Sequence, residues 1–581
     1  MKEGCKWQVG SLVLVALVVV SDASIARDAT EAVDWTDAQR IAVGRKIYQQ
    51  GVLPSGVALE GIAQANVRRM GAAAACINCH RRSGYGSSEG TLEIRAITGP
   101  ALFATHEARP VAAEPVNPAQ RASFDRVDAA KLAAQTLREA RTVALYGVRP
   151  RPPYDDGTLR RAIRDGIDVT GRRLDPGMPR FTLDDDAMQA LAAYLRTLSA
   201  QIPPGVTTDQ VHLATVIQPG VEAAKRNALI AVLQGFVDDR NAGMRAEVRQ
   251  HLAGAVRLGR TYREWVLHVW DLDGSPDDWG QQLDALYRTQ PVFALVSGIG
   301  DASWRAIHDF SERHEIPCIF PQTDLPVVDG PGLYTIYLSQ GLVLEGRALA
   351  KYLHDEGAGG SVVQIYRRGE PGAAAAAAFR GAWAAGSRAA PDEVVLDGTP
   401  DEAFWRQLAR DRRDSTFVIW LAANDLANAG ALWADASRVT DVYLSSSLQA
   451  GHAGPNPAGA RGRTRLVYPL ELPPARAQRV ATVSRWLQKK DIAPSDERVE
   501  MNAYLAVLVT AGVMSHTKDV LSRDLLIEGV EHRVGNAMDP AIYPHLSLGP
   551  GQRFASKGSY IVELKGDDGR ALESVSEWIV P

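Results

Sequence analysis

Cys76-Ile77-Asn78-Cys79-His80 carries the most specific chemical information in this chain. Two cysteines separated by two residues and followed directly by a histidine form the pattern through which a c-type haem is attached. The two thiols bond to the vinyl groups of one haem, and the histidine binds its iron from one side. A disulfide or a thioredoxin-like redox pair uses the same cysteine spacing, but a redox pair follows a strand in a βαβ unit. Here the Ala-rich run 72–75 precedes the motif, so we expect one covalently bound haem c.

A second ligand to the iron is expected from a loop farther along the chain. Met178 stands between Gly177 and Pro179, in a Pro/Gly-rich stretch that favours a stiff, non-helical loop. Histidine and methionine together are the axial ligands of electron-carrying cytochromes c. Methionine also fills gaps in protein cores, which is the role expected of Met188 within its apolar helical pattern. With His80 and Met178 both on the iron, no open position is left for substrate, so we expect an electron carrier rather than an enzyme.

Two helical patterns flank the motif. In the first, residues 40–48, Gly44 and Tyr48 lie four positions apart and so share one face. The second, residues 187–198, follows the acidic run 184–186, and acidic residues are favoured in the first turn of a helix. We expect these helices to open and close one small domain.

Together these features resemble class I cytochrome c over about residues 36–200. The resemblance implies an all-α domain in which the glycine and the aromatic residue of the first helix pack against Tyr194 of the last. It also implies that the carbonyl of Pro100 accepts the N–H of the axial histidine, a bond that fixes the ring and its basicity. The interval between motif and methionine is longer than in compact members, and its segments 107–117 and 149–153 are interpreted as surface loops.

The start of the chain predicts export. An apolar run at 12–20 follows two lysines and precedes the small residues 23–26, which is typical of a secretory signal peptide spanning 1–26. An uncleaved N-terminal anchor is the alternative, although the run is short for a membrane span. We expect a periplasmic protein with no later transmembrane segment. Cys5 leaves with the signal peptide, and Cys318 is interpreted as a small buried hydrophobe.

Length and composition predict a second, larger domain. The chain has 581 residues, too many for one cytochrome domain. Its net charge of −4 suggests no nucleic-acid partner. The Pro/Gly stretch 201–208 is interpreted as a linker. Beyond it, in 209–581, apolar strand-like runs alternate with helical patterns, which favours parallel α/β sheets.

This second region resembles the type I periplasmic solute-binding proteins, the receptors of branched-chain amino acid ABC transporters. The resemblance rests on the order of five segments: 234–243, 297–300, 321–324, 338–353 and 502–506. It implies two lobes, each a doubly wound parallel sheet. Ligands of such sheets sit at the carboxyl ends of the strands, which here places the ligand between the lobes.

The resemblance also implies residues for a ligand cleft. Ser297, Gly298, Gln322 and Thr323 match first-lobe positions, and Asn424 follows a strand of the second lobe. Their hydroxyl, amide and backbone N–H groups suit a small polar or anionic ligand. Each of these residues is also ordinary in a turn, and that alternative stays open.

Two classes of function follow. The first is a periplasmic electron-transfer protein that takes an electron from a dehydrogenase and passes it to a cytochrome or an oxidase, with the second module sensing a ligand or docking the partner. The second is an ABC-transporter-type solute receptor with an accessory haem domain. No Gly-x-Ser-x-Gly, P-loop or His-Glu-x-x-His pattern indicates an enzyme. The complete set of haem ligands favours the first class.

Overall fold

A computed structural model gives the fold for most of the chain. It describes residues 35–89, 92–106, 151–251, 263–330, 332–356, 361–386, 389–434, 439–449, 463–517, 520–535, 540–565 and 571–581. The expected signal peptide and the expected loop 107–117 lie outside the described residues. Within the described part of the chain, no helix combines the length and the hydrophobicity needed to cross a membrane.

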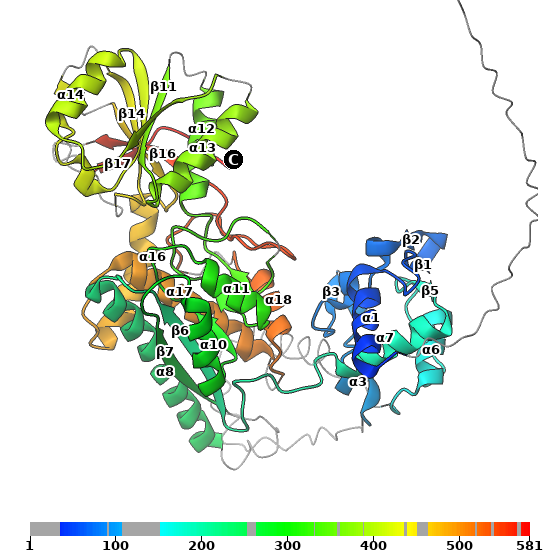
Figure 1. The fold of residues 1–581 in the computed structure, drawn as a ribbon. Coiled ribbons are helices and arrows are strands. Elements are labelled where there is room, and N and C mark those ends of the chain that lie inside the picture. Colours follow the sequence, from blue (N-terminus) through cyan, green and yellow to red (C-terminus); the bar gives the residue numbers. More distant parts are fainter. Residues whose placement is uncertain are drawn as a thin grey trace, which may run out of the picture.

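Figure 1 shows an N-terminal domain in blue and cyan and two α/β lobes in green to red. In its described part the N-terminal domain, within residues 35–200, is built from helices and five short strands. Its helices are α1 (Asp37–Gln50), α2 (Ile77–His80), α3 (Gly99–Phe103), α6 (Asp156–Asp165) and α7 (Asp185–Thr197), with 3₁₀ turns at Gln64–Asn66 and Gly71–Ala74. Its strands are β1 (Glu60–Ile62), β2 (Arg68–Met70), β3 (Ser87–Glu89), β4 (Leu92–Ile94) and β5 (Arg180–Thr182).

The expectation of an all-α N-terminal domain is therefore wrong. Strands β2, β1 and β5 form an antiparallel sheet in that order, and β3 pairs with β4. Each strand has three residues, which is too short to give an alternating pattern that a sequence window can detect. The sheet places β5, which follows the Met178 loop directly, beside the β1–β2 hairpin.

The predicted packing of the first helix on the last is confirmed. Helix α1 begins with a capping box between Thr36 and Gln39, which satisfies backbone N–H groups at its start. A Cβ atom on Gly44 would lie 2.0 Å from the carbonyl oxygen of Ala190, so only glycine lets α1 approach α7 this closely. The rings of Tyr48 and Tyr194 lie 5.3 Å apart between centroids. The two helices thus form the centre of this domain's core.

The first lobe contains a five-stranded parallel sheet in the order β10-β9-β8-β6-β7. Its strands are β6 (Gln210–Ile217), β7 (Glu264–Asp271), β8 (Ala294–Val296), β9 (Cys318–Ile319) and β10 (Thr335–Ile336). Its helices are α8 (Ala223–His251), α10 (Trp279–Thr289), α11 (Arg305–Arg313), α16 (Pro473–Lys489), α17 (Glu497–Thr517) and α18 (Arg523–Arg533). Cys318 is fully buried in this lobe, as its sequence context predicts.

The second lobe contains a seven-stranded sheet in the order β12-β11-β13-β14-β15-β16-β17, parallel up to β15 and antiparallel at the last two pairings. Its strands are β11 (Val362–Arg367), β12 (Asp392–Leu396), β13 (Ser415–Trp420), β14 (Val439–Ser445), β15 (Thr464–Tyr468), β16 (Tyr560–Lys565) and β17 (Ala571–Ser574). Its helices are α12 (Leu342–Asp355), α13 (Gly372–Ala385), α14 (Glu402–Asp411) and α15 (Gly430–Ala434), with a 3₁₀ turn at Ala423–Leu426. The predicted two-lobed α/β fold with parallel sheets is confirmed.

The chain passes between the lobes at several points. It leaves the first lobe after β10 and enters α12, returns after β15 into α16, and crosses again before β16. Two of these crossing segments run side by side, because the backbone N–H of Tyr337 donates to Arg553 and that of Ala555 donates to Tyr337, at 2.7 and 3.1 Å. A hinge between the lobes would lie in these crossing segments, because hinges are a few loop or element-terminal residues.

The N-terminal domain is docked on α18 of the first lobe. Ser83 donates its backbone N–H and its hydroxyl to the two carboxylate oxygens of Glu528, at 2.8 and 2.6 Å. Arg82 Nε lies 3.2 Å from Asp524 Oδ1, and this carboxylate also accepts the hydroxyl of Tyr334 at 2.7 Å. The contact is polar, and it lies three residues after His80.

Candidate haem site and inter-lobe cleft

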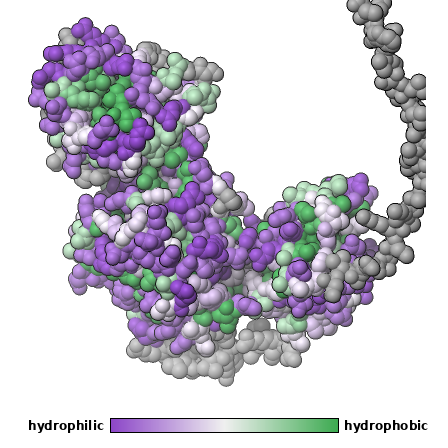
Figure 2. Space-filling model, viewed as in Figure 1, coloured by the Kyte–Doolittle hydropathy of each residue, from purple (hydrophilic) through white to green (hydrophobic). Residues whose placement is uncertain are grey.

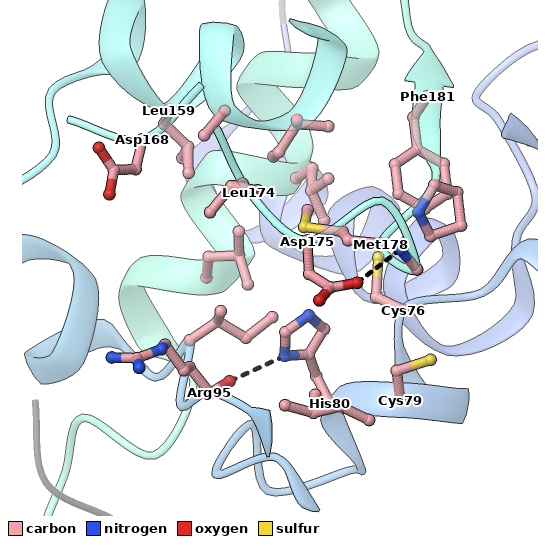
Figure 3. Close-up of a pocket in the computed structure, with 18 of the residues that line it drawn as sticks. Cys76, Cys79, His80, Arg95, Leu159, Asp168, Leu174, Asp175, Met178 and Phe181 are labelled. Carbon is pink, nitrogen blue, oxygen red and sulfur yellow. Dashed lines mark hydrogen bonds between the residues drawn. The ribbon is translucent and has the colours of Figure 1, made fainter. Parts of the chain in front are cut away.

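A cavity of about 420 Å³ lies in the N-terminal domain, and all four predicted haem ligands line it. Cys76, Cys79 and His80 come from the α2 turn, and Met178 comes from the loop before β5. Figure 3 shows the two thiols on one side of the cavity, with His80 and the Met178 loop on facing walls. The fold therefore brings together residues that are about a hundred positions apart in the sequence.

The α2 turn positions the motif side chains. It begins at Cys76, whose carbonyl accepts the backbone N–H of His80 at 2.9 Å. This single turn sets both cysteines and the histidine around one end of the cavity. The cysteines are not joined by a disulfide, and burial raises the pKa of Cys76 to about 12. A reactive redox cysteine has a lowered pKa, so the thioredoxin-like alternative is disfavoured.

His80 is held in one orientation by a backbone carbonyl. Its Nδ1 lies 3.0 Å from the carbonyl oxygen of Arg95, drawn as a dashed line in Figure 3. Donation from Nδ1 leaves the lone pair on Nε2. Burial lowers the pKa of His80 to about 4, which keeps the imidazole neutral, the form that binds a metal.

The predicted hydrogen bond from His80 to the carbonyl of Pro100 is wrong. Pro100 stands in the first turn of α3, and its carbonyl accepts the backbone N–H of Ala104 within the helix at 3.2 Å. The same oxygen also lies 3.1 Å from His106 Nε2. The carbonyl of Pro100 is therefore hydrogen-bonded within α3 and to the residue that follows it closely, His106. His80 is hydrogen-bonded to the carbonyl of Arg95 instead.

The loop around Met178 is stiffened by hydrogen bonds at both of its ends. The side chain of Asp175 accepts the backbone N–H of Gly177 at 2.7 Å, and its carbonyl accepts that of Met178 at 3.1 Å. The carbonyl of Pro176 accepts the backbone N–H of Gln64 at 3.0 Å, which ties the loop to the β1–β2 connection. The methionine is thus presented to the cavity on a fixed turn, as the Pro/Gly pattern predicts.

The donor set and the walls fit a haem. Apolar side chains line the interior: Leu59, Ile94, Leu102, Leu159, Leu191 and Leu195. The polar lining contains five arginines, at positions 69, 95, 151, 172 and 173, beside three carboxylates. Glu93 pairs with Arg95 and Asp168 pairs with Arg172, which leaves the other three arginines for an anionic group. The apolar side chains suit the flat macrocycle of a haem, and the arginines suit its propionate carboxylates. The arginines were not identified from the sequence, because residues spread over a hundred positions give no local pattern.

The predicted first-lobe cleft residues lie together at the carboxyl ends of β8 and β9. Ser297 is 1% exposed, and its Oγ accepts Gln322 Nε2 at 3.2 Å. The same amide donates to the carbonyl of Val499 at 3.2 Å. Thr323 Oγ1 accepts the backbone N–H of Leu325 at 3.0 Å, and Gly298 has a φ of +106° that favours glycine. Asn424 lies exposed on the second lobe, apart from this group.

Charged pairs occupy the same ends of the strands, and none of their residues is among the predicted ligand-binding residues. In the first lobe Arg498 Nη1 lies 3.3 Å from Asp324 Oδ2, beside the hydroxyl of Tyr543. In the second lobe Arg367 Nη2 lies 2.8 Å from Asp425 Oδ1. Both guanidinium groups are therefore already neutralised by carboxylates. Within the described residues no group of three or more metal-ligating His, Cys, Asp or Glu side chains occurs.

No protein-family model and no curated protein matches this sequence. Solved structures do resemble it. The fatty acid ABC transporter substrate-binding protein from Thermomonospora curvata is 16% identical, covering 66% of this chain and 95% of that chain, with a TM-score of 0.45. A solute-binding protein from R. palustris in complex with benzoate is 16% identical, covering 64% and 97%, with a TM-score of 0.45. An ABC transporter substrate-binding protein from Sphaerobacter thermophilus is 14% identical, covering 64% and 98%, with a TM-score of 0.47. At such identities and scores the similarity implies no function for this chain.

Proposed function

We propose that the N-terminal domain binds one haem c and carries one electron. Cys76 and Cys79 would hold the haem by thioether bonds, with His80 and Met178 as axial ligands of its iron. The observation that supports this most directly is the convergence of these four side chains on one apolar cavity. Because both axial positions are taken, the site suits electron transfer and not substrate chemistry.

The chain's own residues set the conditions for that role. The Arg95 carbonyl orients His80 and strengthens it as a donor, which is the usual effect of a bond to the second ring nitrogen. The Asp175 turn holds Met178 in place without help from its side chain. The apolar walls exclude water, and a dry surrounding favours the less charged form of a redox centre. The bound haem itself supplies the one-electron chemistry.

Haem content and ligation test the proposal. The protein expressed in a cell that attaches haem c should show one haem per chain by pyridine haemochrome and mass spectrometry. Met178→Ala should remove the weak absorption band of a thioether–iron bond while keeping the haem attached. Met188→Leu is the matched control, because Met188 is a core methionine, 3% exposed, that does not line the cavity. Identical spectra for wild type and Met178→Ala would rule out the assigned ligand.

A second candidate function is that of an ABC-transporter-type solute receptor with an accessory haem domain. Two parallel-sheet lobes joined by a hinge support it, since such lobes hold ligands between the ends of their strands. The proposed ligand is small and polar or anionic, and it would contact Ser297, Gly298, Gln322 and Thr323 on one lobe and Asn424 on the other. Entry of a ligand requires Gln322 to exchange its bond to Ser297 for one to the ligand.

Ligand screening separates the two candidates. A thermal-shift screen of carboxylates, amino acids and aromatic acids should find a stabilising compound if the lobes form a receptor. Binding should weaken in Ser297→Ala and in Thr323→Ala and stay unchanged in Ser275→Ala, an exposed serine in the loop after β7. If a compound also changes the rate of haem reduction, the two-lobed module regulates electron flow in the periplasm. If the compound binds without such an effect, the receptor function gains support. The redox partner, a dehydrogenase, cytochrome or oxidase, then docks independently of ligand binding.

A further inference from the structure

The residue directly after His80 has a backbone conformation that side chains rarely adopt. Arg81 ends α2 with a φ of +63° and a ψ of 175°. This region of backbone space belongs almost entirely to glycine, because a Cβ atom is crowded there. A residue with a side chain persists in it only where the surrounding structure holds it, and such residues concentrate at functional sites. The conformation of Arg81 therefore needs a restraint from elsewhere in the fold.

Tyr48 of α1 supplies such a restraint. Its side chain is 0% exposed, and its hydroxyl donates to the carbonyl oxygen of Arg81 at 2.7 Å. The ring of Tyr48 packs against that of Tyr194 on α7. Packing between the two helices accounts for the ring, and a phenylalanine would pack in the same way. The hydroxyl has a separate role, which is to hold the Arg81 carbonyl in one direction.

The rest of this turn is held without strain. The carbonyl of His80 accepts the backbone N–H of Gly86 at 3.1 Å. Ser83 donates to Glu528 of α18, and its carbonyl accepts the hydroxyl of Ser199 at 2.8 Å. Figure 2 shows hydrophilic residues where the N-terminal domain meets the first lobe. Within residues 80–86 the other positive φ values belong to glycines, so the strain of the turn is confined to position 81.

Release of the strained residue would act directly on His80. The φ of Arg81 sets the orientation of the peptide unit that joins it to His80. Without its bond to Tyr48, Arg81 can relax towards a negative φ, and that peptide unit then turns with it. The imidazole of His80 is fixed at its other end, because Nδ1 lies 3.0 Å from the carbonyl oxygen of Arg95. A turned peptide would therefore pull the ring away from this bond.

We propose that Tyr48 is a positioning residue for the axial ligand His80, which it holds in one direction through the backbone of Arg81. The inference rests on the proposed haem. Tyr48 does not line the cavity, so it acts on the iron only through His80. Groups that orient a metal-binding imidazole also tune how strongly it donates to the metal. The hydroxyl of Tyr48 and the carbonyl of Arg95 thus fix the two ends of the same ligand.

A small set of variants separates the hydroxyl from the ring and the strain from the Arg81 side chain. Tyr48→Phe removes only the hydroxyl. Arg81→Gly removes the strain, whereas Arg81→Ala removes the long side chain but keeps the strained Cβ. In the ferric protein, the hyperfine-shifted NMR resonances of the axial imidazole report its orientation. Tyr48→Phe should split or broaden these resonances. Tyr48→Phe/Arg81→Gly should restore the wild-type set, and Tyr48→Phe/Arg81→Ala should not.

Hydrogen exchange measures the same turn without relying on the haem. The amide of Gly86, bonded to the carbonyl of His80, should exchange about 5- to 150-fold faster in Tyr48→Phe, which is the range expected when a strained residue is released. Arg81→Gly in the same background should return the exchange rate to that of the wild type. Tyr194→Phe is the matched control, because it removes the hydroxyl from the neighbouring ring and should change neither readout.

Each outcome decides the proposal. Unchanged resonances and unchanged exchange in Tyr48→Phe would overturn it and leave the proposed haem standing. Changes that Arg81→Gly does not reverse would also overturn it, because Tyr48 would then act through core packing. If Tyr48→Phe does not fold, the melting temperatures of Arg81→Gly and Arg81→Ala decide. Glycine is ordinarily the less stable of the two, and strain at this position requires the reverse order. Absence of haem from the wild type would refute the proposed function and the positioning role with it.

Discussion

Replacing Glu528 by alanine should release the N-terminal domain from the first lobe. The carboxylate accepts the backbone N–H and the hydroxyl of Ser83, at 2.8 and 2.6 Å, and Ser83 is 0% exposed. Alanine leaves both donors without this acceptor. Each unsatisfied buried donor costs about 1–3 kcal/mol, and water entering the interface recovers part of that. We expect a net loss of about 2–4 kcal/mol, which is roughly 30- to 1,000-fold in the docking equilibrium.

The measurement uses a cleavable linker. A protease site placed after Ile202 allows the two parts to be separated, and isothermal titration calorimetry measures how tightly they re-associate. Wild-type parts should stay associated, although the linker composition alone predicts two independent soluble pieces. Glu528→Ala should weaken association by the factor above, whereas Glu402→Ala on α14, a glutamate paired only with an exposed arginine, should not. Equal affinities for wild type and Glu528→Ala would refute the reasoning.

Three further predictions follow from the same contacts. Burial raises the pKa of Glu528 to about 7, so between its ordinary pKa and pH 7 the docked carboxyl holds a proton that the separated carboxyl has lost. Docking should therefore weaken as the pH rises from about 5 to 8. Glu528→Gln, which does not titrate, should flatten that dependence in the same calorimetric titration. Arg523 donates to the carbonyls of Val292 and His314 at 2.7 and 3.0 Å, so Arg523→Ala should lower the unfolding free energy by about 3 kcal/mol in urea, with Arg523→Lys recovering only part. Gly44→Ala should destabilise the N-terminal domain by about 1–3 kcal/mol or more in thermal melts, because its Cβ would overlap Ala190, whereas Gly157→Ala in α6 should not destabilise it.

The sequence predicts those parts of the candidate haem site that depend on local spacing. The cysteine–histidine motif fits within one turn of helix, and the Met178 loop follows from its own prolines and glycine. The contact of Gly44 with the last helix follows from the family resemblance. The hydrogen-bond partner of His80 could not be predicted in this way, because the carbonyl that lies beside an imidazole depends on the path of a loop in space. Nothing local at Arg95 distinguishes its carbonyl from that of Pro100.

The sequence predicts where the candidate ligand-binding residues lie on the sheet, but not how their side chains are oriented. Strand order in a parallel sheet places Ser297 and Gln322 at the same edge, because the residues after neighbouring strands meet there. The pattern gives no information on whether the hydroxyl faces the cleft or the neighbouring amide, and the structure has it accepting from Gln322. The docking contact between Ser83 and Glu528 joins residues 445 positions apart, so no periodicity or motif signals it.

The docking contact bears on what a closure of the two lobes would do to the N-terminal domain. Arg523, at the start of α18, is bonded to backbone carbonyls of the first lobe and the linker, including that of Pro204. Helix α18 therefore moves with the first lobe, and Glu528 carries the N-terminal domain along with it. Closing the lobes would then move the second lobe relative to a unit made of the first lobe and the N-terminal domain. A ligand shifts an equilibrium only through its different affinity for the two states. If the proposed function holds, an effect of ligand on electron transfer would then arise from the access of a partner to the N-terminal domain, because its contact with α18 does not depend on the second lobe.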